Sequence, residues 1–250
     1  MSGHNKWSTI KHQKGAADAR RGQLFTKLAK NIALAAQKGG SDPDTNFSLR
    51  LSIDKARAAN MPKDNIERAI KRGTGEDKSG AAYEEIVYEG YLAHGIAILM
   101  ECVTDNRNRT IAEVRAVLNR HGGSMAEGGS VSWQFDRVAY FSFPPAGRSE
   151  DEILEIALEA GVDDVQFDPE QVDLVAPVEN FKSVSDALQA NKITPEESGL
   201  RFDAQNLTEL SLEHTRQIVR TIEALEDLDD VQNVYSNLDV SEEMAAALDQ

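Results

Sequence analysis

The residue types that carry chemistry are present in this chain, but their spacing does not form a familiar catalytic or metal site. Asp42-Pro-Asp44-Thr-Asn46 begins like a calcium loop, yet Phe47 and Ile53 stand where that loop needs glycine and glutamate. Residues 123–128 have the glycine spacing of a phosphate loop, but Gly129-Ser130 replaces the required Lys-Ser/Thr pair. The sequence therefore predicts no calcium site, and it predicts a flexible connection where the phosphate loop would be.

The other candidate groups are scattered. Cys102 is the single cysteine and lies in an apolar run, which favours a buried structural thiol over a nucleophile. Carboxylates concentrate at 163–164 and 226–230, and a solvated acidic surface is the ordinary explanation for them. No nucleophile stands beside a base in a recognisable motif. Five histidines lack the spacing of zinc ligands: His4, His12, His94, His121 and His214. We therefore expect a protein that is not an enzyme and that has no metal and no cofactor.

The clearest chemical signal is the separation of charge along the chain. Residues 1–75 hold 15 Lys and Arg against 6 Asp and Glu, a net charge of +9. The remaining residues hold 12 Lys and Arg against 36 Asp and Glu, a net charge of −24, and the two parts add up to the −15 of the whole chain. Lys and Arg neutralise phosphates whatever the base sequence. The amino-terminal part is therefore predicted to bind nucleic acid, and the acidic remainder must have another role.

Ten residues of the basic part are the predicted nucleic-acid contacts. Trp7 offers a stacking surface for a base, and it lies among cations. In the helix expected from Asp18, Leu24, Leu28 and Ile32 form one apolar stripe that should face inward, and most of the cations fall on a flank away from it. The predicted contacts are Lys6, Trp7, Lys11, His12, Lys14, Arg20, Arg21, Lys27, Lys30 and Lys38.

A second anion site is predicted at Arg107 and Arg109. These arginines follow a helix-cap signal, Thr104-Asp105-Asn106, so two guanidinium groups would lie beside free backbone N–H groups. Helix capping with local salt bridges is the competing interpretation. We find no clear short turn followed by a recognition helix, so strong base-specific binding in the major groove is not expected.

The periodicity of hydrophobic residues predicts an α+β protein of three domains. Three helices are expected in the basic part, at about 18–39, 44–60 and 62–73. Strands at 85–91, 95–103 and 130–135 surround a helix that starts near 106. A β-α-β-β-α-β series follows between 140 and 202, which is the ferredoxin-like order. A helix at 212–225 and a strand at 231–236 could complete the earlier strands. The predicted domains are 1–76, 77–136 with 205–240, an inserted ferredoxin-like unit at 137–204, and an acidic tail at 241–250.

The chain shows no sign of export or of membrane insertion. No apolar run approaches the roughly 18–20 residues of a membrane span, and the first residues lack the apolar core of a secretion signal. The basic start also fits an organellar transit peptide, but Trp7 and the glycines suit a folded or substrate-bound arm better. One cysteine fits a reducing compartment. We expect a cytoplasmic protein.

Several longer motifs carry a resemblance to a known family. In order they are Gly3-His-Asn-Lys-Trp7, Arg21-Gly-Gln-Leu-Phe-Thr-Lys27, Gly40-Ser-Asp-Pro-Asp44, Asn60-Met-Pro62, Tyr88-Glu-Gly-Tyr91, Thr104-Asp-Asn-Arg-Asn-Arg-Thr110, Gly129-Ser-Val131 and Leu225–Asn237. Together they resemble the YebC/PmpR family, which includes the mitochondrial translational activator of cytochrome c oxidase. The resemblance implies a helical amino-terminal domain and two α+β domains, the last inserted into the second. Leu92-Ala-His94 and Val138 depart from the pattern.

The resemblance implies two kinds of function. Bacterial members are commonly described as probable transcriptional regulators that bind DNA, whereas other members help the ribosome through difficult sequences such as proline runs. Our main hypothesis is a non-enzymatic, DNA-binding regulator of transcription. The alternatives are a ribosome-associated translation factor that binds ribosomal or transfer RNA, and an adaptor whose acidic domains bind RNA polymerase or ribosomal proteins.

Overall fold

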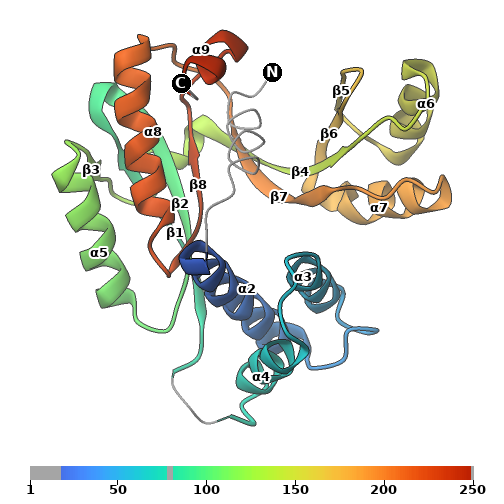
Figure 1. Ribbon diagram of the computed structural model, residues 1–250, viewed down its shortest axis with the longest axis horizontal. Helices are drawn as coiled ribbons and strands as arrows, with labels where there is room; N and C mark the ends of the chain where they lie inside the picture. The colour runs from blue at the N-terminus through green and yellow to red at the C-terminus, as the bar shows by residue number, and fades with distance from the viewer. Residues whose placement is uncertain (1–17, 78–80, 249–250) are drawn as a thin grey trace.

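The computed structural model of the protein describes residues 18–77 and 81–248, and it contains a helical domain and two antiparallel sheets (Figure 1). This confirms the predicted α+β fold class. Each sheet has four strands, and helices cover one face of each. No helix in the described part of the chain combines the length and apolar character needed to cross a bilayer.

The basic domain consists of α2 (Asp18–Gly39), α3 (Phe47–Ala58) and α4 (Lys63–Gly73). The three helices share a core that includes Ile32, Leu49 and Ile66. Asn46 fixes the connection between α2 and α3, because its Oδ1 accepts from Leu49 N while its Nδ2 donates to Ala35 O at 2.8 Å. Gly73 lies so close to α2 that a Cβ atom there would be 2.2 Å from Ala33 O. The domain is therefore held by close backbone packing as well as by side chains.

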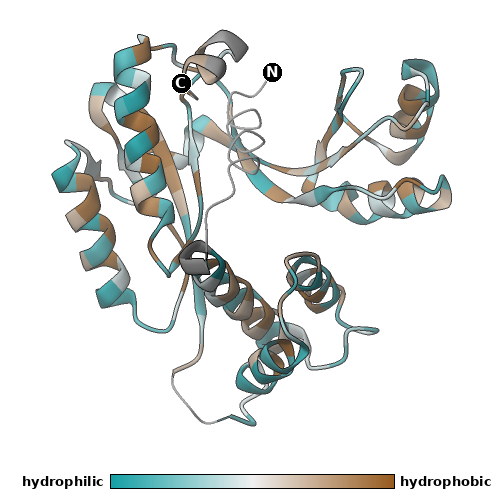
Figure 2. Cartoon of the chain, viewed as in Figure 1, coloured by the Kyte–Doolittle hydropathy of each residue, from teal (hydrophilic) through white to brown (hydrophobic). Residues whose placement is uncertain are grey.

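The central sheet has the strand order β3-β1-β2-β8. Its strands are β1 (Glu84–Tyr91), β2 (Ala97–Thr104), β3 (Ser124–Met125) and β8 (Val231–Ser236), and a short η1 (Ala93–Gly95) joins β1 to β2. Its helices α5 (Arg107–Arg120) and α8 (Leu212–Glu226) cover one face, with buried Met100, Leu118 and Ile222 between the layers. Hydrophobic and hydrophilic residues alternate around both helices in Figure 2, as expected for helices with one buried side. A last helix, α9 (Glu242–Leu248), packs against α8.

The prediction of a strand at residues 130–135 is wrong. The third strand of the central sheet is instead the short β3, and residues 132–134 form a short 3-10 helix, η2 (Ser132–Gln134). The cause is the buried side chain of Glu89, which accepts hydrogen bonds from the backbone N–H groups of Gly129, Val131 and Ser132. Backbone groups held by one carboxylate cannot take part in a strand ladder, so the segment turns.

The chain between η2 and α8 forms the second sheet, in the order β5-β6-β4-β7. Its elements are β4 (Phe135–Phe143), α6 (Glu150–Ala160), β5 (Asp164–Phe167), β6 (Val172–Pro177), η3 (Val178–Asn180), α7 (Phe181–Ala190) and β7 (Glu197–Ala204). This order and connectivity are those of a ferredoxin-like unit. Strands β4 and β7 are longer than predicted and pair over eight residues. Their extended ends reach the central sheet, where Phe202 lies against Tyr235 with ring centroids 5.5 Å apart.

The helical domain contacts both α+β parts. Ala33 and Leu34 of α2 form a small buried cluster with Tyr83 and Val103 at the central sheet. On the other side, Phe47 of α3 meets Phe181 of α7 edge to face, with centroids 6.0 Å apart. Three parts of the chain therefore surround a common junction.

Candidate nucleic-acid interface

The structure divides the predicted nucleic-acid contacts into three groups. Five of them lie outside the described residues: Lys6, Trp7, Lys11, His12 and Lys14. Arg20 lies in the first turn of α2, but its side chain is also outside the described part. Arg21 and Lys38 are exposed at the two ends of α2. Lys27 and Lys30 lie between them and face another part of the protein.

Lys27 and Lys30 hold α2 against the carboxyl end of α8 and the loop after it. Lys27 Nζ donates to Glu226 O at 2.5 Å, and Lys30 Nζ donates to Asp229 O at 2.7 Å. Lysines are favourable at the carboxyl end of a helix, where backbone carbonyls lack partners. Lys30 is only 7% exposed, so the prediction that it faces solvent is wrong. The helix pattern identified a flank but could not reveal that another domain covers it.

The expected inward stripe of α2 also differs in one place. Leu24 is 45% exposed, whereas Ile32 is fully buried in the helical core. Leu28 is partly buried and packs at the edge of the same core. The first turns of α2 extend past α3 and α4. Leu24 lies on the apolar stripe, but at this end of the helix the other two helices do not cover it.

Asp230 is the centre of a buried ionic cluster at this joint. Its carboxylate accepts from Lys30 Nζ at 2.5 Å and from Arg109 Nη2 at 2.8 Å. The hydroxyl groups of Thr104 and Thr110 donate to Oδ2 at 3.1 and 2.7 Å. Asp230 is 1% exposed, so its charge is stable only because these donors surround it. One carboxylate thus ties the helical domain, β2 and α5 together.

The donors determine the charge state of Asp230. Burial alone would raise the pKa of its carboxyl group. The hydrogen bonds from Lys30, Arg109 and Thr110 favour the charged form more strongly, and they lower the pKa to about 2. The Asp230 carboxylate therefore remains ionised throughout the physiological pH range.

The predicted second anion site at Arg107 and Arg109 is occupied by carboxylates of the protein itself. Arg109 binds Asp230 and also Asp105, whose Oδ1 lies 3.0 Å from Nη2. Arg107 pairs with Glu84, with Nε 2.7 Å from Oε2. Asn106 caps α5 by accepting from Arg109 N. These contacts are the ones expected from the competing interpretation of this segment, which was helix capping with local salt bridges instead of an anion site.

Asp105 extends this ionic cluster back to the helical domain. Its Oδ2 accepts from Arg72 Nη2 at 3.0 Å. The Arg72 guanidinium also lies over the ring of Tyr83, 4.2 Å from the ring centroid. Like the contacts of α2, this contact of α4 with the central domain is therefore made by a cation of the basic domain.

Other exposed cations of the helical domain lie on α3 and α4. We call Arg50, Arg57, Lys63, Arg68 and Lys71 the basic face, and all five are exposed. The acidic neighbours are weak partners: Arg57 lies 3.5 Å from Asp54, and Lys63 lies 3.5 Å from Glu67, with all four side chains at least half exposed. Arg50 lies over the ring of Phe47. None of the five was among the predicted contacts, although the charge count of the domain includes them.

Four residues, 59–62, join α3 to α4. Asn60 takes a left-handed conformation there, with φ of 58°, and Met61 N bonds to Ala56 O at 2.9 Å. This short turn alone does not make α4 a recognition helix, so the expectation that the domain lacks strong base-specific binding in the major groove stays a prediction. Apart from glycine, asparagine is the residue type that most readily adopts this left-handed conformation. Asn60 was therefore the signal in the sequence that indicated the turn.

Family models match almost the whole chain. A model described as the TACO1/YebC protein N-terminal domain matches residues 5–76, and a model described as the TACO1/YebC second and third domain matches residues 83–238. The chain belongs to the TACO1/YebC family. The boundary between the two matches falls in the connection between the helical domain and β1, which agrees with the division seen in the structure.

The relatives of this TACO1/YebC protein share its full length. A protein of Chlorobaculum parvum is 49% identical over 100% of both chains, and one of Acidithiobacillus ferrooxidans is 50% identical over 100% of this chain and 99% of its own. Each is named a probable transcriptional regulatory protein. The crystal structure of a conserved hypothetical protein from Aquifex aeolicus is also similar, with 40% identity and a TM-score of 0.83 over 93% of this chain and 96% of that one.

Two of the motifs that suggested the family have structural roles. Tyr88-Glu-Gly-Tyr91 contains Glu89, which holds the turn at 129–132, and Gly90, where a Cβ atom would lie 2.8 Å from Ser124 O. Thr104–Thr110 supplies four side chains to the ionic cluster around Asp230: Thr104, Asp105, Arg109 and Thr110. Within the described residues, no group of three or more His, Cys, Asp or Glu side chains could hold a metal ion.

Proposed function

We propose that this protein is a regulator of transcription that binds DNA through its basic amino-terminal domain and acts without catalysis. The observation that carries the proposal is the charge division, +9 in the first 75 residues against −24 in the rest. It coincides with a structural division, because the positive part is a separate helical domain. The names of full-length relatives, probable transcriptional regulatory proteins, support transcription as the process.

The proposed DNA contacts combine the basic face with those predicted contacts that are exposed or lie outside the described residues. The basic face offers five exposed cations on two helices joined by a short turn. Arg21 is exposed as well. The first seventeen residues add Lys6, Trp7, Lys11, His12 and Lys14, together with Arg20 of the following helix. We leave Lys27, Lys30, Lys38, Arg107 and Arg109 out of the interface, since each is engaged within the protein.

The remaining domains have a separate proposed role. With a net charge of −24, they would repel the DNA backbone at long range, so DNA should meet the helical domain alone. An acidic surface suits a basic protein partner, and a component of RNA polymerase is the partner that fits a transcriptional role. The single cysteine, which is buried, fits the reducing cytoplasm.

The experiment that tests the proposal is crosslinking in cells, followed by sequencing of both the DNA and the RNA recovered with the protein. We expect enrichment of defined promoter segments that persists after ribosomes are removed. Purified protein should protect the same segments at physiological salt. Recovery of ribosomal or transfer RNA, with no enriched DNA, would overturn the proposal in favour of a translation factor.

A further inference from the structure

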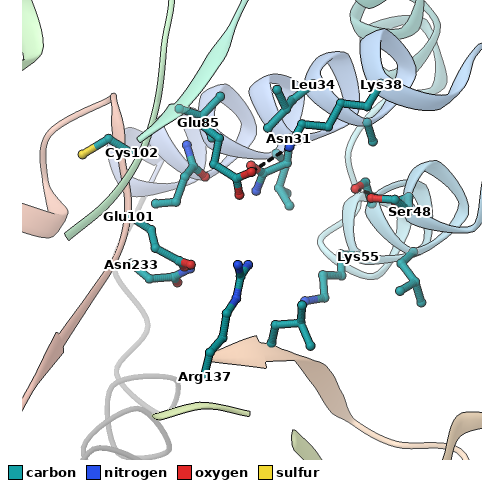
Figure 3. Close-up of a pocket in the computed structure, with 17 residues that line it drawn as sticks. Asn31, Leu34, Lys38, Ser48, Lys55, Glu85, Glu101, Cys102, Arg137 and Asn233 are labelled. Atoms are coloured by element: carbon teal, nitrogen blue, oxygen red, sulfur yellow. Dashed lines mark hydrogen bonds and ion pairs between the residues drawn. The ribbon is translucent and has the colours of Figure 1, made fainter. Parts of the chain in front are cut away.

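A cleft of about 270 Å³ lies where the helical domain, the central sheet and the inserted sheet meet (Figure 3). Asn31 and Lys38 of α2 and Lys55 of α3 line one side. Strands β1, β2 and β8 line another, and Arg137 of β4 with Leu200 of β7 completes the lining. The volume is close to that of pockets that hold small molecules, and it is too small for a duplex.

Two cations project into this cleft. Arg137 extends into the opening between Glu101 and Lys55 (Figure 3), and its guanidinium also packs over the Phe202 ring, 5.6 Å from the ring centroid. Lys55 Nζ lies near Gly199 of β7. Although the Lys55 side chain keeps contact with solvent, protein surrounds it on several sides. The resulting desolvation lowers the pKa of Lys55, and the carboxylates of Glu197 and Glu101 oppose this effect.

Gln232 adds a donor without a partner. Strand β8 has an irregular register against β2, in which Glu101 pairs with Asn233 and Cys102 pairs with Val231, so Gln232 is the extra residue of a bulge. Bulges turn a side chain out of the regular strand pattern. Gln232 lines the cleft, and its Nε2 is buried and has no hydrogen-bond partner among the described residues. Such a donor is costly unless an acceptor binds it.

The carboxylates of the cleft have partners of their own. Glu85 binds Lys38, with Oε2 2.7 Å from Nζ. Glu101 accepts from Asn233 Nδ2 at 3.0 Å and from Tyr235 OH at 2.8 Å. These contacts leave the cations Arg137 and Lys55 and the Gln232 amide as the groups available for a ligand. All three donate hydrogen bonds, and two of them are positively charged.

We propose that this cleft binds the phosphate group of a mononucleotide-sized phosphate ester. The Arg137 guanidinium presents parallel N–H groups that match two phosphate oxygens. Lys55 supplies a second positive charge, and Gln232 donates to a third oxygen. Glu101 repels the anion and keeps its affinity low. The ligand is a free mononucleotide or one nucleotide unit of a single strand, since both present the same phosphate chemistry. The inference does not depend on the proposed DNA contact, because Arg137 and Gln232 lie outside the basic domain.

The test is an NMR titration of the full chain with three probes: adenosine 5′-monophosphate, adenosine, and a single-stranded oligodeoxyadenosine. At least one phosphate probe should shift the side-chain amides of Asn31 and Gln232, while adenosine should not. Arg137→Gln should weaken binding by about tenfold, because a charged hydrogen-bond donor is lost. Arg115→Gln is the matched control, since Arg115 is exposed on α5 outside the cleft lining. Binding of the mononucleotide identifies a free ligand, and binding of the oligonucleotide alone identifies a strand.

Glu101→Gln separates this proposal from a site for a cationic ligand. The amide can still accept from Tyr235 and Asn233, but the negative charge is gone. Phosphate binding should therefore become tighter, by a few-fold. Weaker binding in this variant, equal binding of adenosine and its monophosphate, or an unchanged affinity in Arg137→Gln would each overturn the proposal. Thermal unfolding of every variant establishes that it is folded.

Discussion

Two sets of cations in the helical domain have opposite surroundings. Lys27, Lys30 and Arg72 contact the central domain, and Lys30 is almost fully buried against Asp230. The five cations of the basic face are exposed, and within the described residues their ion pairs are long or absent. The comparison shows that a high local charge can serve two purposes in one domain. Part of it joins domains through carboxylates and helix ends, and part of it remains for a partner.

The largest expected effect comes from breaking the internal set. Asp230→Ala leaves Lys30 and Arg109 without their shared carboxylate in a buried place. We expect a loss of about 3–5 kcal/mol in the free energy of unfolding, measured by urea denaturation. Asp229→Ala is the matched control, because the Asp229 side chain is exposed and only its backbone carbonyl accepts from Lys30. Similar losses in both variants would show that the cluster is not the source of stability.

The same carboxylate gives a second, smaller effect that depends on pH. The pKa of Asp230 is lowered from 3.8 to about 2, so the folded state binds this proton less readily than the unfolded chain does. Its contribution, about 2 kcal/mol, is fully present above about pH 4 and is lost as the pH falls through about 2. Urea denaturation of the wild type and of Asp230→Asn should therefore differ most near neutral pH and converge in acid. A difference that is constant down to pH 2 would argue against this charge state.

The buried Glu89 and the exposed Glu127 allow the same kind of comparison between two acidic residues. Glu89 binds three backbone N–H groups, and although burial opposes ionisation, these hydrogen bonds lower its pKa. Glu89→Gln should cost about 1–2 kcal/mol and speed amide exchange at Val131 and Ser132, because charge-assisted bonds become ordinary ones. Glu127→Gln changes an exposed side chain at the edge of the same turn and is the control. Equal exchange rates in the two variants would mean that Glu89 does not hold the turn.

Local sequence patterns predicted most of the fold. The strand predicted at 231–236 agrees with the structure residue for residue, and the series predicted between 140 and 202 has the β-α-β-β-α-β order that the structure shows. The strand at 130–135 was wrong because the side chain of Glu89, about forty residues earlier in the chain, uses the backbone donors that a strand would need.

The candidate site was harder to predict, because exposure depends on how domains pack. Lys30 and Lys38 have the same charge and lie on the same helix, yet one is buried and the other is exposed. Nothing in the helix periodicity distinguishes them, since the covering group, Asp230, lies 200 residues away. The motif around Arg109 was recognisable, but its partner carboxylate was not. Charge counts therefore located the basic domain, and only the fold separates its internal cations from its external ones.

The most direct test of this account is the salt dependence of binding to duplex DNA. Arg68→Ala with Lys71→Ala removes two exposed cations from α4, and Arg115→Ala with Arg120→Ala removes two exposed cations from α5 in the central domain. For the α4 variant we predict an affinity for DNA that is lower by on the order of tenfold, whatever the DNA sequence. The slope of log K against log salt should be smaller in magnitude by about 2. The α5 variant should match the wild type in both. An unchanged affinity and slope in the α4 variant, with the protein still folded, would contradict the assignment of the basic face to nucleic acid.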